Sequence, residues 1–209
     1  LGKETVQNIL VFRFANAIFE SLWNSRHIDH VQITVAESIG IGSRGHFFEE
    51  QGILRDVVQY HMMQLLSLTA MEPPANLSAD AIRGEKVKVL ECLRAYSEED
   101  FSSSVVRAQY TEGFIEGEKA LAYRKEIDVS PNSTIETFLA LRVFIDNWRW
   151  DGVPFYLRAG KRLPKRGTEI AIVFKDAPGV LFKEAGKNPP NVLAIRIQPD
   201  EGISMKINC

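Results

Sequence analysis

The sequence predicts an α+β fold in which N-terminal helices pack on a large, mainly antiparallel β-sheet. Up to about residue 104, apolar residues recur at the three- and four-residue spacing of an amphipathic helix. Beyond that point the chain contains short β-branched and aromatic runs separated by Gly, Pro and Asn. Most of these runs have no helical segment between them, so we expect antiparallel neighbours rather than βαβ units.

Helices and one strand fill the first half of the chain. The second helix ends before Pro73-Pro74, because proline cannot continue a helix. The β-branched run before a glycine-rich loop is expected to be a short strand. In chain order, the expected elements are a helical stripe over residues 6–22, a strand over 31–35, a loop over 40–45, and helices over 49–71 and 78–93.

Strands fill the second half. Each run is rich in β-branched and aromatic residues and is bounded by turn-forming residues. Residues 137–148 make a longer run, which we expect to form one long strand. The shorter strands are expected over residues 104–110, 153–159, 170–174, 192–197 and 203–207.

Composition excludes several classes of protein. The chain has 209 residues, of which 45% are hydrophobic and 25% charged, as in globular proteins that bury a core. A net charge of −2 argues against nucleic acid or an anionic membrane as the partner. Two cysteines fit a reducing compartment, so we expect a cytoplasmic protein. No apolar run reaches the ~18 residues of a membrane span.

Residues 40–45 (GIGSRG) match the G-x-G-x-x-G pattern between a strand and a helix, so a dinucleotide site is one interpretation. The context does not fit that interpretation. Gly52 interrupts the start of the next helix, and a further helix follows instead of a second parallel strand that carries an acidic residue. We therefore favour a flexible loop whose glycines serve its turns.

His61 lies in the middle of the apolar arc of the second helix, calculated at 100° per residue. It is either a buried core histidine, which this pattern favours, or a catalytic base. Five residues of helix place Asp56 about 140° around the axis from His61. We therefore expect Asp56 to line the same cavity from its edge without orienting the imidazole.

Three further features are candidate binding sites. Glu37 follows the first strand, where site residues collect, although a solvated glutamate is the commoner case. Lys3 at a helix start is unfavourable beside the helix dipole unless an anion binds there; the alternative is a mobile lysine. Five cations lie between Arg158 and Arg166 with no acidic residue before Glu169, so a bound polyanion and a solvated loop both remain open.

Aromatic residues stand just before this basic run, and such a mixture is also found where single-stranded nucleic acid binds. The nearly neutral remainder of the chain argues against that partner.

Seven segments of the chain carry a recognisable pattern. They are residues 1–9 (LGKETVQNI), 13–16 (RFAN), 56–61 (DVVQYH), 70–74 (AMEPP), 85–90 (EKVKVL), 149–155 (RWDGVPF) and 158–161 (RAGK). These segments resemble the glucose-6-phosphate dehydrogenase family, and the first of them looks like the tail of the family signature R-I-D-H-Y-L-G-K-E. The resemblance covers the chain from end to end and in order.

This resemblance implies oxidation of glucose 6-phosphate to 6-phosphoglucono-δ-lactone with reduction of NADP, and no metal. The family's D-x-x-x-N-H motif falls on His61 as the catalytic base, with Tyr60 in place of the usual Asn. The resemblance further implies sugar contacts and phosphate contacts. The implied sugar contacts are Glu37 and Asp56, and the implied phosphate contacts are Lys3, Lys161 and Arg166.

The resemblance also bears on domains and partners. It implies that residues 1–209 form one truncated C-terminal domain, that NADP binds mainly to a coenzyme domain preceding it, and that a homodimer or tetramer forms through the sheet. We expect glucose 6-phosphate as the substrate, and no nucleic acid or membrane as a partner. The alternative is a catalytically silent module that binds sugar phosphates or other polyanions.

Overall fold

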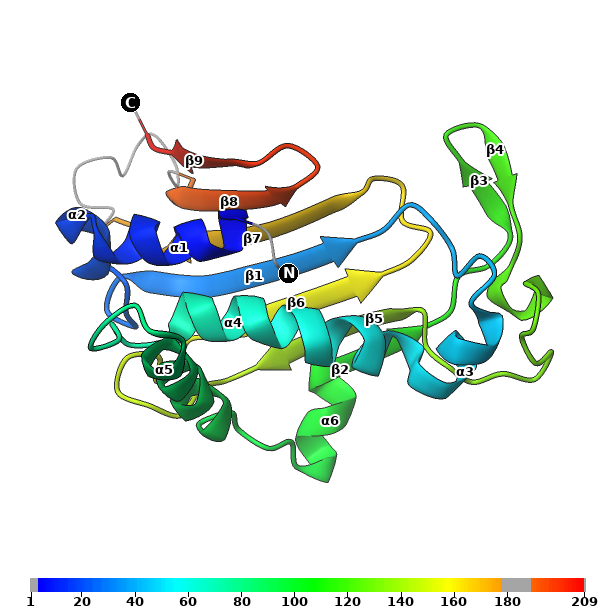
Figure 1. Ribbon diagram of the computed structural model, residues 1–209, viewed down its shortest axis with the longest axis horizontal. Coiled ribbons are helices and arrows are strands. Elements are labelled where there is room, and N and C mark those ends of the chain that lie inside the picture. Colours follow the sequence, from blue (N-terminus) through cyan, green and yellow to red (C-terminus); the bar gives the residue numbers. More distant parts are fainter. Residues whose placement is uncertain (1–3, 178–188, 209) are drawn as a thin grey trace.

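A computed structural model describes residues 4–177 and 189–208, and its centre is a seven-stranded sheet. Helices lie across one face of this sheet (Figure 1). In order across the sheet the strands are β2 (Val105–Ala108), β5 (Phe138–Val143), β6 (Phe155–Gly160), β1 (Ile28–Ala36), β7 (Gly167–Phe174), β8 (Val192–Gln198) and β9 (Gly202–Lys206).

The sheet is mainly antiparallel, so the predicted fold class is confirmed. Among the described residues, five of the six neighbouring strand pairs are antiparallel and only β1 and β6 run parallel. Because parallel strands end at the same edge of a sheet, the residues that follow β1 and β6 lie next to each other. This edge carries Glu37 and Lys161.

The helical half contains more breaks than the sequence predicts. Three elements were not predicted: α6 (Glu98–Ser104), a 3-10 turn (Tyr123–Lys125), and a β3–β4 hairpin (Gly113–Ile115 and Glu118–Ala120) that projects from one end of the molecule (Figure 1). The helices are α1 (Glu4–Phe14), α2 (Ala17–Glu20), α3 (Gly45–Ile53), a π-helix (Leu54–Met62), α4 (Met63–Ala70), α5 (Ala79–Glu91), α6 (Glu98–Ser104) and a 3-10 turn (Tyr123–Lys125).

Two predicted elements were too long. The stripe expected over residues 6–22 is broken between α1 and α2, so its apolar residues do not share one continuous helical face and Ile18 is 69% exposed. The strand expected over 137–148 ends at Val143. The chain turns soon afterwards, where the Asn147 side chain accepts a 2.9 Å hydrogen bond from the backbone N–H of Trp150.

Gly52 causes the largest break, within the helix expected over residues 49–71. Its φ of 61° lies in the left-handed region, which favours glycine. A Cβ at this position would lie 2.6 Å from the Glu136 carboxylate. Glu136 bridges the break, because its backbone carbonyl accepts from Ile53 N (3.1 Å) and its side chain accepts from Leu54 N (3.3 Å).

The hydrophobic core lies between the sheet and the helices. It is continuous, and it joins α1, the π-helix and α4 to the central strands. None of the helices in residues 4–177 and 189–208 is long and apolar enough to cross a membrane. Core residues that are at most 1% exposed include Ile9, Trp23, Val31, Ile33, Met62, Leu65, Trp150, Phe155, Ile170 and Ile172.

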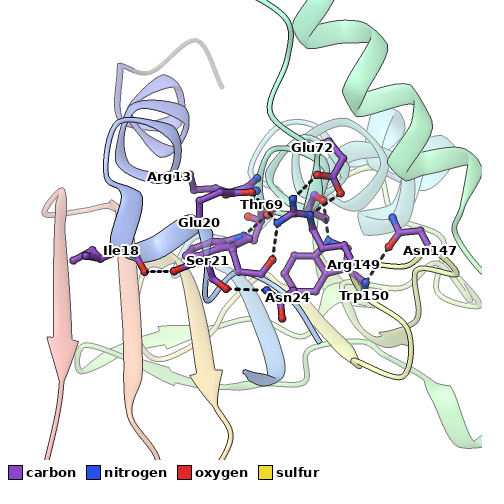
Figure 2. A network of polar contacts seen from close by, with 12 residues as sticks. Arg13, Ile18, Glu20, Ser21, Asn24, Thr69, Glu72, Asn147, Arg149 and Trp150 are labelled. Carbon is purple, nitrogen blue, oxygen red and sulfur yellow. Dashed lines mark hydrogen bonds and ion pairs between the residues drawn. The ribbon is translucent and has the colours of Figure 1, made fainter. Parts of the chain in front are cut away.

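A network of charges centred on the buried Arg13 ties α1 and α2 to the end of α4 (Figure 2). Arg13 is fully buried, pairs with Glu20 at 3.2 Å and donates a 3.0 Å hydrogen bond to the carbonyl of Leu68. Burial lowers the pKa of Arg13 to about 10, even though Glu20 favours its charged form. Arg149 pairs with the other oxygen of Glu20 at 2.8 Å and, through Nε, donates to Glu72 at 2.7 Å.

Candidate functional site

A cavity of about 240 Å³ lies at the sheet edge where β1 and β8 end and β7 begins. Its wall combines an imidazole, a carboxylate and a guanidinium with apolar side chains, which suits a small anionic ligand that has several hydroxyl groups. The lining residues are Val35, Ala36, Glu37, Ile39, Val57, His61, Leu65, Arg166, Thr168, Ile197 and Gln198.

His61 lines this cavity and is exposed, so the interpretation of His61 as a core histidine is wrong. Leu54, which the spacing of 100° per residue puts on the same apolar arc as His61, is 46% exposed. The phase calculation failed because the helix breaks at Gly52 and continues as a π-helix. The inward positions of the π-helix are Val57, Val58 and Met62, and His61 stands beside them at the cavity wall.

The π-helix also changes the relation between Asp56 and His61. The separation of 140° holds only for an α-helix. In a π-helix the hydrogen bonds join residues five apart, which places such residues close to one another on the same side. Asp56 is half-buried and is not among the residues that line the cavity, so the expectation that it lines the cavity from its edge is wrong.

Glu37 and Lys161 are held together at the carboxyl ends of the parallel strands. Lys161 is only 2% exposed, and its Nζ contacts Glu37 Oε2 in an ion pair. The same ammonium lies 5.4 Å from the centroid of the Phe48 ring in α3. Glu37 lines the cavity and Lys161 does not. The Lys161 ammonium therefore lies behind the Glu37 carboxylate as seen from the cavity.

Arg166 is exposed, lines the cavity and donates a 3.3 Å hydrogen bond to Gln198 Oε1. Two other cations of the basic run have partners away from the cavity. Arg162 pairs with Glu126 at 3.5 Å, and Arg158 contacts the Thr34 hydroxyl at 3.4 Å. The run is therefore divided among separate partners, and it does not form a single basic patch.

Of the three cations expected around a phosphate, Arg166 lies on the cavity and Lys161 lies behind Glu37. Lys3 lies outside the described residues. Thr168 and Gln198 belong to the cavity wall as well. The sequence could not single them out, because they are ordinary polar residues on paired strands and only the pairing of β7 with β8 brings them together.

The loop over residues 40–45 uses its glycines for close packing. A Cβ on Gly40 would lie 2.8 Å from Arg162 Nε, and one on Gly45 would lie 2.0 Å from the Ile127 carbonyl oxygen. Gly40 and Gly45 therefore face their own chain and not a dinucleotide, whereas Gly42, with a φ of 59°, has open space around it. No group of three or more His, Cys, Asp or Glu that could hold a metal occurs within residues 4–177 and 189–208.

The chain matches known proteins over its whole length. Residues 10–209 match the model for the family described as "Glucose-6-phosphate dehydrogenase, C-terminal domain". The glucose-6-phosphate 1-dehydrogenase of Chlamydia muridarum is 57% identical over 100% of this chain and 41% of the relative. The corresponding protein of Bacillus subtilis is 50% identical over 100% of this chain and 43% of its own length.

Solved structures give the same result. A glucose-6-phosphate dehydrogenase in complex with its substrate glucose-6-phosphate superposes with a TM-score of 0.89 and 38% identity, over 100% of this chain and 41% of that one. Glucose-6-phosphate 1-dehydrogenase from Mycobacterium avium gives a TM-score of 0.83 and 38% identity, and the match covers 97% of this chain and 42% of that one. The chain spans about two fifths of the length of these proteins. It belongs to the family of glucose-6-phosphate dehydrogenase C-terminal domains.

Proposed function

We propose that this chain is the substrate-binding part of an NADP-dependent glucose-6-phosphate dehydrogenase, which catalyses the first step of the pentose phosphate pathway. Family membership supports the proposal. The observation that carries it is the single cavity lined by His61, Glu37 and Arg166. A base, a hydroxyl acceptor and a phosphate-binding cation are the groups that oxidation of a sugar phosphate at C1 requires.

In this proposal His61 is the general base. Imidazole accepts and releases protons near neutral pH, and His61 stands at the cavity wall, where a sugar can reach it. It takes the proton from the C1 hydroxyl while the C1–H bond breaks and the C1–O bond becomes the lactone carbonyl. NADP, when bound, supplies the hydride acceptor.

The remaining residues bind the substrate. Glu37 accepts hydrogen bonds from sugar hydroxyls. Asp56 is the second acceptor that the family resemblance implies, although it does not line the cavity of the chain as described. Arg166 binds the phosphate with charge-assisted hydrogen bonds, and Lys3 adds a second cation. The chain covers about two fifths of its relatives, and Gly40 and Gly45 of its glycine loop face their own chain. We therefore assign most of the NADP site to the rest of a longer polypeptide.

We further propose a cytoplasmic homodimer or tetramer that assembles through the sheet. The exposed apolar side chains of β9, Ile203 (44%) and Met205 (46%), support an interface at this end of the sheet. Light scattering of the chain at high concentration should give the mass of a dimer. A single monomeric species would count against the sheet interface.

A second candidate function is a catalytically silent module that binds sugar phosphates without turnover. The observation that favours it is that the chain matches only 41% of the length of its Chlamydia muridarum relative. Thermal shift of the chain with glucose 6-phosphate, NADP or an oligonucleotide tests binding. We expect stabilisation by glucose 6-phosphate and none by the oligonucleotide, and the reverse would contradict both candidates. Activity of the full-length protein separates them, because only an enzyme reduces NADP. We expect that the chain of 209 residues alone does not reduce NADP.

A further inference from the structure

Lys161 is a buried cation in a chain whose other lysines in this region face solvent. Only 2% of Lys161 is exposed, whereas Lys165, four residues later, is exposed. A buried ammonium is strongly unfavourable unless a charged partner compensates for the loss of water. Glu37 is that partner, and the face of the Phe48 ring adds a second favourable contact.

The backbone fixes both members of this pair. The parallel register pairs Ala36 with Gly160 at the ends of β1 and β6. The ladder then continues past the strands, because Glu37 N donates to the Gly160 carbonyl at 2.9 Å and Leu163 N donates to the Glu37 carbonyl at 2.9 Å. The Lys161 N–H donates to a third segment, at the Thr137 carbonyl (3.0 Å). Neither side chain therefore depends on a mobile loop for its position.

The two charges face different surroundings. Glu37 lines the cavity with 31% of its side chain exposed, while the Lys161 side chain is 1% exposed and is absent from the cavity wall. The ammonium lies against one carboxylate oxygen, Oε2. A carboxylate has a second oxygen with its own lone pairs, which can accept from a ligand hydroxyl.

We propose that Lys161 is a positioning residue: its ammonium holds the Glu37 carboxylate in the orientation that accepts sugar hydroxyls, and it does not contact the phosphate. This inference rests on the proposed function for the identity of the sugar. Among the described cations of the basic run, the one that lines the cavity is Arg166, which carries the phosphate role. Lys161 then acts at the sugar end of the site, through Glu37.

Kinetics of the full-length protein with two substrates separate these roles. The Lys161→Met variant keeps the length of the side chain and removes its charge. Glu37 binds hydroxyl groups equally well in the ground state and in the transition state. A substitution that disturbs the orientation of the Glu37 carboxylate therefore raises KM and leaves kcat nearly unchanged. We expect KM to rise by about 10- to 100-fold for glucose 6-phosphate and, by the same factor, for glucose, which lacks the phosphate.

A double-mutant cycle with Glu37→Gln tests the coupling. Once Glu37 has lost its charge, Lys161→Met should change KM by no more than about threefold, because the two residues act as one unit. The matched control is Lys165→Met, which removes an exposed cation of the same run and should leave both substrates unaffected. A partly unfolded variant would lower the apparent kcat without changing KM.

Two outcomes overturn the proposal. A loss confined to glucose 6-phosphate, with glucose unaffected, would make Lys161 a phosphate ligand. Additive effects of the two substitutions would make Lys161 and Glu37 independent.

Acetylation of the chain with acetic anhydride, followed by mass spectrometry, tests the pair if Lys161→Met does not fold. We expect Lys161 to react much more slowly than Lys165, with no change on adding inorganic phosphate, and to react faster in Glu37→Gln. Protection of Lys161 by phosphate would overturn the proposal. If the wild-type full-length protein does not oxidise glucose 6-phosphate, the proposed function fails, while this labelling still decides whether Glu37 holds Lys161.

Discussion

The indole N–H of Trp150 donates a 2.8 Å hydrogen bond to the carbonyl oxygen of Ala70, the last residue of α4. Trp23 makes the equivalent bond to the Thr69 carbonyl at 2.7 Å. The last carbonyls of a helix have no partner within the helix, and here buried side chains supply the donors. These bonds fix the C-terminal end of α4, which directly follows the π-helix that carries His61, and they connect it to segments far away in the sequence.

Substitution Trp150→Phe should destabilise the chain by about 1–3 kcal/mol, because it leaves the buried Ala70 carbonyl without a donor. Urea unfolding followed by circular dichroism measures the change. Trp148→Phe is the matched control, since Trp148 is fully exposed and its loss should leave the free energy of unfolding unchanged. Equal stability of the two variants would show that the indole bond contributes nothing.

Stability should also fall in acid through Glu49. Burial raises the pKa of this carboxyl, but hydrogen bonds from the Ser133 and Tyr123 hydroxyls and the Ser130 N–H outweigh burial and lower it below the ordinary value of 4.5. A lowered pKa means that the ionised group stabilises the folded state above that ordinary value. This stabilisation is lost as the pH falls through the pKa of the folded state.

Urea unfolding at about pH 7 and about pH 3.5 checks this linkage. We expect Glu49→Gln to be less stable than the wild type at the higher pH, and the difference to shrink at the lower pH. Glu50→Gln, at the exposed neighbouring position, should show no such convergence. A difference that is independent of pH would contradict the assignment of the effect to ionised Glu49.

Much of the fold could be predicted because strands and helices differ in their local period. The runs that became β6, β7, β8 and β9 are β-branched and bounded by turn residues, and each was placed within a few residues of its observed limits. The errors occurred where distant contacts decide local structure. Gly52 is stabilised by Glu136, which lies more than eighty residues later, so the helix break and the π-helix left no local signal.

In the candidate site, too, local sequence predicted some features and distant contacts decided the others. Its charged residues could be named from motifs, but their surroundings could not. The basic run lacks acidic neighbours in sequence, yet Lys161 meets Glu37 and Arg162 meets Glu126. These carboxylates come from other parts of the fold. The exposure of His61 depended on the break at Gly52 and was therefore predicted wrongly.

Arg166→Met should weaken recognition of the phosphate alone. A hydrogen bond to a charged group contributes about 1.5–3 kcal/mol, which corresponds to a rise in KM for glucose 6-phosphate of roughly 10- to 150-fold. KM for glucose should stay the same, because glucose offers no phosphate to Arg166. Steady-state assays of the full-length protein with both sugars measure the difference. A rise in KM for both sugars would place Arg166 elsewhere in the site.

The central claim is that His61 removes the C1 proton, and steady-state oxidation of glucose 6-phosphate by the full-length His61→Asn variant tests it most directly. Asparagine keeps a polar group of similar size but cannot accept a proton near neutral pH. We therefore expect KM to stay nearly unchanged and kcat to fall by about 10²–10⁴-fold. His46→Asn, at an exposed position away from the cavity wall, should retain full activity. A His61→Asn enzyme that keeps most of its kcat would contradict the account.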